Sequence, residues 1–152
     1  MASLVRQGVM ICIVLGMVAG CGDKTPDQPK RPTVVQAGET LKLHIMALME
    51  KINAQDVKII DQGGRDIPCG EGLAKRAFAI TGRSLSQNIR PYSLNLDLVG
   101  MLNSVASYQI VEEHGPGPIR MARSVDGTVI ILDSPANGQY QVRGETECLS
   151  AS

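Results

Sequence analysis

The residues that could carry out chemistry are few in this chain, and they do not form a recognised catalytic motif. The 152 residues include two histidines, His44 and His114. His44 falls at the edge of the apolar face of a predicted helix, so we expect a helix-surface residue. His114 follows two glutamates and precedes a Gly-Pro-Gly-Pro run, and a metal site there would need more ligands than this segment supplies. We therefore expect a solvated turn at His114 and no metal ion.

Candidate nucleophiles and cofactor-binding loops are equally sparse. No serine lies in the Gly-x-Ser-x-Gly pattern of hydrolases, and no glycine-rich loop has the spacing of a phosphate- or dinucleotide-binding site. Cys69 would be a catalytic thiol only if it were not paired with another cysteine. Asp61 and Glu71 would act as an acid–base pair only if the fold brought them into one pocket. The sequence therefore predicts a protein without enzymatic activity and without a cofactor.

The overall charge and the aromatic content argue against one class of partner. The chain has 15 basic and 15 acidic residues, whereas nucleic-acid binding depends on clustered positive charge. It contains no tryptophan, one phenylalanine and three tyrosines, so a platform for stacking bases or sugars is not expected. We expect no nucleic acid among the partners.

The N-terminal segment has the pattern of an export signal. Arg6 is the one charged residue among the first 20, and the uncharged run over residues 8–20 ends in small residues. These 13 residues are too short to cross a bilayer core, which takes about 20 helical residues. A cleaved signal is therefore favoured over a transmembrane anchor, and residues 1–20 are predicted to be removed.

The end of this segment, Val18-Ala19-Gly20-Cys21, resembles the lipobox of bacterial lipoproteins. The resemblance implies that the signal is cut before Cys21 and that this cysteine carries at least two acyl groups, such as palmitate. Two chains anchor a protein stably, so we expect the mature protein on the extracytoplasmic side of the cell membrane. Because Gly22 and not Asp follows the cysteine, a Gram-negative cell would send it to the outer membrane. An ordinary secretory signal cut near Ala19 is the alternative.

The mature chain divides into a tether and one domain. Residues 21–36 begin with the lipidated cysteine, and the stretch that follows it contains three prolines and five charges. Such a composition buries little surface, so we expect an extended tether. Residues 37–152 are long enough for a single domain with its own core.

Cys69 and Cys148 remain after the signal is removed and Cys21 is lipidated. In an oxidising exported compartment, an even pair is expected to form a disulfide. The bond would close a loop of about 80 residues and stabilise the fold by roughly 4–5 kcal/mol. Two unpaired buried thiols are the alternative.

Two segments have the apolar period of amphipathic helices. Their core-facing residues are Leu41, Ile45, Leu48, Met49 and Ile52 in the first, and Leu94, Leu98, Met101, Leu102 and Val105 in the second. Strand-like runs follow each helix, and Asp126-Gly127 predicts a hairpin. We predict an α+β fold, with two helices on one face of an antiparallel sheet of five to six short strands. A shift of 53 residues superposes the helices, so an internally duplicated helix–strand–strand unit and a chance likeness are both open.

The C-terminal segment is predicted to contain two short strands, over residues 139–143 and 145–149. Cys148 would then lie on the last strand, and Cys69 in a loop. The tether, the alternation of helices and strands, and the ending Gly144-Glu145-Thr146-Glu147-Cys148-Leu149 loosely resemble small actinobacterial lipoproteins. This resemblance implies an α+β fold and an envelope location, and no particular activity.

Each predicted helix also has apolar residues that point away from its core-facing side. These residues are Leu43 and Met46 in the first helix and Leu96 and Val99 in the second. Such a second face is either covered by another part of the chain, here the tether or the loop over residues 82–92, or it binds a partner. We therefore expect a non-enzymatic, membrane-anchored binding module for a protein or an apolar ligand. The alternatives are an anchored cell-envelope hydrolase with a loop-built site and a structural subunit of an envelope assembly.

Overall fold

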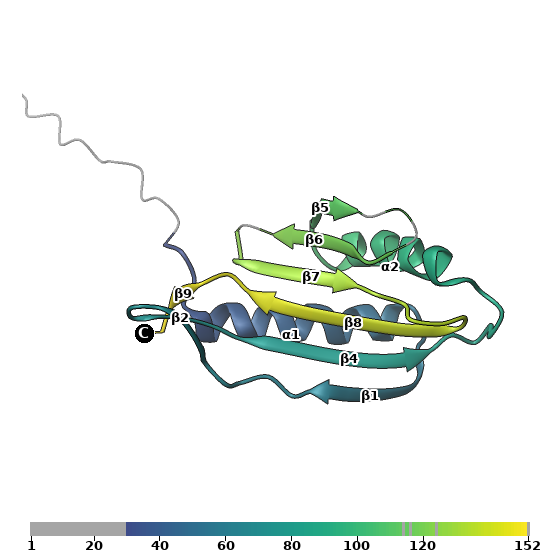
Figure 1. Cartoon of the computed structure of the whole chain (residues 1–152), viewed down its shortest axis with the longest axis horizontal. Coiled ribbons are helices and arrows are strands. Elements are labelled where there is room, and N and C mark those ends of the chain that lie inside the picture. Colours follow the sequence, from purple (N-terminus) through teal and green to yellow (C-terminus); the bar gives the residue numbers. More distant parts are fainter. Residues whose placement is uncertain (1–29, 114, 116, 124, 152) are drawn as a thin grey trace, which may run out of the picture.

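The computed structural model describes residues 30–113, 115, 117–123 and 125–151. The predicted signal, the predicted lipidation residue Cys21 and His114 lie outside the described residues. The described chain is an α+β fold, as predicted from the sequence, and it contains two sheets and two helices (Figure 1).

The larger sheet has six strands in the order β1-β4-β8-β7-β6-β5. These are β1 (Gln55–Asp61), β4 (Ala77–Arg83), β8 (Gln139–Thr146), β7 (Thr128–Leu132), β6 (Ile119–Arg123) and β5 (Gln109–Glu113). Every neighbouring pair is antiparallel. The predicted hairpin joins β6 to β7, and Gly127 has the positive φ, 60°, that such a turn favours.

Both helices, α1 (Val34–Lys51) and α2 (Pro91–Val105), lie on the same face of this sheet (Figure 1). The core between the layers contains Leu41 and Ile45 of α1, Leu94 and Leu98 of α2, and the inward-facing side chains of the strands. Gly144 of β8 lets α1 come close, because a Cβ at this position would lie 2.5 Å from Leu41 Cδ1. The other face of the sheet has no covering layer among the described residues.

The first helix begins at Val34, which is three residues before the domain boundary expected from composition. A capping box explains the start, because the Thr33 hydroxyl accepts a hydrogen bond from the Gln36 backbone and the Gln36 side chain accepts one from Thr33. Val34 and Ala37 are buried against Ala74 and Leu149 in a second, smaller core cluster.

A small second sheet forms this cluster, and the sequence did not predict it. Its strands are β2 (Ile67–Gly70), β3 (Leu73–Lys75) and β9 (Leu149–Ser150), in the order β2-β3-β9. The disulfide between Cys69 and Cys148 is confirmed, with a Cα–Cα distance of 6.0 Å. Cys69 lies on β2 and not in a loop. Cys148 lies between β8 and β9, because β8 continues without a break from the first predicted C-terminal strand into the second and ends at Thr146.

Candidate functional site

An apolar groove lies between α1 and the edge strand β1. Its volume is about 400 Å³, and its lining residues are Leu43, Met46, Ala47, Met49, Glu50, Ala54 and Val57. Leu43 and Met46 are 68% and 40% exposed, because the core takes the opposite side of the helix. The groove thus contains the second apolar face of the first helix, and no described residue of the tether or of the 82–92 loop lines it.

The strand beside this groove has one free edge. β1 pairs only with β4 in the described part of the chain, and all of its residues are exposed. Val57, Ile59 and Ile60 are therefore apolar residues on an open strand edge, and Ile60 is 58% exposed. Exposed apolar edge strands are rare in soluble monomers because their backbone groups can pair with another chain.

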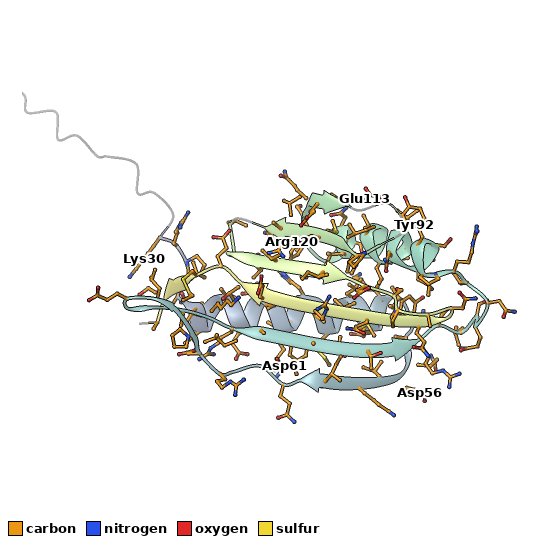
Figure 2. The ribbon with its side chains drawn as sticks, in the orientation of Figure 1. Lys30, Asp56, Asp61, Tyr92, Glu113 and Arg120 are labelled. Carbon is orange, nitrogen blue, oxygen red and sulfur yellow. A yellow bond between two sulfur atoms is a disulfide. The ribbon has the colours of Figure 1, made fainter. Side chains whose placement is uncertain are left out.

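The second apolar helix face lies elsewhere. Tyr92 of α2 donates a hydrogen bond to Glu113 of β5 (3.2 Å), and Asn95 Nδ2 donates to the Gly117 carbonyl (3.2 Å), so this side of α2 faces β5 (Figure 2). Leu96 and Val99 lie on the same side of the helix by the helical period. Leu96 is 45% exposed, whereas Val99 is partly buried and packs against the main core.

The four residues predicted as a partner surface therefore fall into two separate places. Leu43 and Met46 lie beside β1, and Leu96 and Val99 lie toward β5, at the opposite edge of the sheet. β5 is the other edge strand, and it too is exposed along its length, with Val111 at 57%. A single chain does not bring the two helix faces together.

A partly buried chain of hydrogen bonds, which sequence reasoning missed, connects α1 to the sheet. His44 Nδ1 lies 3.0 Å from the Tyr108 hydroxyl, which lies 2.8 Å from Thr128 Oγ1. Burial raises the pKa of Tyr108 to about 12, and burial also lowers the pKa of His44 below its usual value. The expected surface histidine is thus partly buried. Tyr108 is 4% exposed, so its hydroxyl links helix α1 to strand β7 inside the domain.

The open face of the sheet has one notable charge cluster. Burial alone would raise the pKa of Glu145, but hydrogen bonds from Lys75 (3.1 Å) and Arg120 (3.2 Å) outweigh it and lower that pKa. Arg143 is paired with Asp133 at 3.2 Å. These side chains bind one another, so the cluster is satisfied within the chain.

The candidate catalytic carboxylates do not form a site. Asp61 is exposed and accepts a hydrogen bond from the Gly63 backbone, and Glu71 is exposed at the β2–β3 turn. Neither residue lines the α1–β1 groove. Among the described residues, no three His, Cys, Asp or Glu side chains gather closely enough to hold a metal ion.

A further hollow of about 450 Å³ lies at the start of α2, lined by Arg90, Pro91, Tyr92, Ser93 and Asn137. It contains no pair of groups suited to acid–base or nucleophilic chemistry. None of the helices within the described ranges is long and apolar enough to cross a membrane.

The fold and its grooves define an α+β protein with an open-faced antiparallel sheet and an apolar groove at one sheet edge. No protein-family model, no curated protein and no solved structure matches this chain.

Proposed function

We propose that this protein is a lipid-anchored, exported binding module of the cell envelope, and that the groove between α1 and β1 receives an apolar segment of a protein. The observation that carries the proposal is the combination of exposed apolar side chains, Leu43 and Met46, with a strand edge that no other described strand pairs with. An extended segment added to β1 would gain backbone hydrogen bonds, and its alternate side chains would enter the groove.

The position of the groove favours a protein segment over a small ligand. The groove is lined mainly by α1, and Val57 of β1 borders it on the strand side. An extended protein segment could pair with the backbone groups of β1 while its side chains entered the groove, whereas an acyl chain offers no such hydrogen bonds. Two methionines, Met46 and Met49, line the groove. Methionine side chains adapt to irregular apolar partners, as expected of a surface that binds a chain segment.

The proposed anchor fits the location of the chain ends. Lys30 and Ala151 lie at the same end of the molecule, beside the small sheet (Figures 1 and 2). A lipid on Cys21 would therefore hold this end toward the membrane, and the opposite end of the six-stranded sheet would lie farther from it.

The anchor is tested by the intact mass of the detergent-extracted protein and of a Cys21→Ala variant. We expect the wild-type mass to equal residues 21–152 plus acyl groups, and the variant to lose them. A lipid-free wild-type mass would refute the anchor.

The groove is tested with a photoreactive residue placed at Leu43 of the full chain in intact envelopes. Leu85 provides a matched control, because it is an apolar residue that is 75% exposed and does not line the groove. We expect a protein-sized adduct from position 43 and none from position 85. An adduct of lipid mass alone, or no adduct, would refute binding of a protein segment.

A further inference from the structure

We infer that the segment received by the α1–β1 groove is the β5 edge of a second copy of this chain, so that copies join side by side into a continuous sheet. The inference rests on the proposed function, because it names the partner of the same groove. Among the described residues, β1 and β5 are the two edge strands of the six-stranded sheet, and both are exposed along their whole length. Each therefore has backbone groups available to another strand.

The strand directions permit this contact without turning either copy around. Each of the five neighbouring pairs from β1 to β5 is antiparallel, so β1 and β5 run in opposite directions within one chain. A second copy in the same orientation thus places its β5 antiparallel to the first copy's β1. The antiparallel pattern then continues across the junction.

The helix layer continues across the same junction. Leu43 and Met46 of α1 lie beside β1, and Leu96 of α2 lies on the side of its helix that faces β5. Placing β5 against β1 therefore brings α2 of one copy next to α1 of the other. Leu43 and Met46 of one copy then meet Leu96 of the other, and these exposed apolar side chains are removed from water.

The two edge sequences complement each other in one antiparallel register. With Ile59 opposite Val111, Ile60 lies opposite Ile110, and Lys58 lies opposite Glu112. Opposite charges and apolar pairs in such positions stabilise neighbouring strands, whereas like charges destabilise them. Both edge strands also have irregular register with their own neighbours, so the strand contact is short and the helix faces supply further apolar contact.

The proposed anchor favours this arrangement over a two-fold dimer. Antiparallel pairing of β1 with another β1 would invert one copy and place its Lys30 at the far end of the molecule, about 27 Å away by the rise of the 18-residue α1. The nine peptide links from Cys21 to Lys30 span at most about 30 Å. The inverted copy would need a fully stretched tether, whereas copies in one orientation keep all anchors on one side.

The test uses two tagged forms of the full chain, co-expressed in one membrane, with Ile60→Cys in one and Ile110→Cys in the other. Directly opposite residues have Cβ atoms about 5 Å apart, which is close enough for a disulfide between the two copies. We therefore expect the mixed adduct, which joins the Ile60→Cys form to the Ile110→Cys form, to be about tenfold more abundant than an adduct of two copies with the same substitution. The control pairs Leu85→Cys with Ile110→Cys and reports random collision. Adding Leu43→Glu to the Ile60→Cys copy should reduce the mixed adduct to that control level.

Three results would overturn the inference. They are a mixed adduct no more abundant than the collision control, a same-site adduct as abundant as the mixed one, and a mixed adduct unchanged by Leu43→Glu. Folding of each variant is checked by its Cys69–Cys148 bond, which joins β2 to the segment before β9 and includes no residue of either edge strand. If the mixed adduct is absent while the probe at Leu43 captures a different protein, this inference fails and the proposed function stands.

Discussion

Removal of the Cys69–Cys148 bond should show how much of the fold depends on its smaller sheet. The bond joins β2 to the segment before β9, across 79 positions of sequence. The variant is Cys69→Ser with Cys148→Ser, because a single substitution would leave a free thiol. Both cysteines are exposed, so serine replaces them without burying a new polar group.

The expected loss of stability follows from the loop that the bond closes. For a loop of about 80 residues, the chain-entropy relation gives roughly 15 cal/mol/K, which is about 4–5 kcal/mol at 25 °C. A small domain is typically stable by about 5–15 kcal/mol, so this loss is a large share of the total. The remaining attachment of β9 is two paired residues, Leu73 with Ser150 and Ala74 with Leu149.

The assay is guanidinium denaturation of the wild-type protein, the double serine variant and the reduced wild-type protein, followed by circular dichroism. We expect the free energy of unfolding to fall by about 4–5 kcal/mol in both altered forms. Amide exchange should rise first in β9 and at Val34 and Ala37, because these residues share the small core cluster with Leu149.

A loss below about 1 kcal/mol would refute the chain-entropy reasoning, because the closed loop would then leave the unfolded state nearly unchanged. Faster exchange spread evenly over all strands would refute the assignment of a local role to the bond. Agreement between the serine variant and the reduced wild-type protein shows that the loss comes from the bond and not from the serine side chains.

Three further changes test a close contact in the core, a helix cap and the partly buried histidine. Gly144→Ala should destabilise the domain by about 1–3 kcal/mol in the same denaturation assay, because its methyl group would overlap Leu41 Cδ1; unchanged stability would contradict the close approach of α1 to β8. Thr33→Ala should cost about 1 kcal/mol through loss of the capping box, and an unchanged unfolding midpoint would contradict that role. Because burial lowers the pKa of His44 in the folded state, the unfolded state binds more protons. Stability should therefore be complete above pH of about 6.5 and decline as the pH falls below it. His44→Gln should remove that part of the decline, and an identical pH profile would contradict the role given to the histidine.

Local sequence patterns predicted the two helices and the β6–β7 hairpin well, because these elements depend mostly on residues that are close in sequence. The apolar period of α1 identifies Leu41 and Ile45 as core residues, and Asp126-Gly127 identifies a hairpin. The small sheet has no such pattern, because β9 is two residues long and exists through pairing with β3. Similarly, His44 has a helical position that indicates the surface, and only the distant Tyr108 gives it a buried partner.

The second apolar faces of the helices show, for the candidate binding surface, what sequence patterns do not predict. The period of the first helix correctly places Leu43 and Met46 away from the core. In the second helix it is right for Leu96 but wrong for Val99, which packs against the core, and for Met101, which the period places in the core although it is 44% exposed. The period does not indicate where those faces point relative to each other, because that depends on the order of strands in the sheet. Since β1 and β5 are the two ends of that order, the faces lie at opposite edges and cannot cover each other within one chain. Leu43, Met46 and Leu96 therefore stay exposed within the described part of the chain, and the proposed second copy in the same orientation would bring these side chains together.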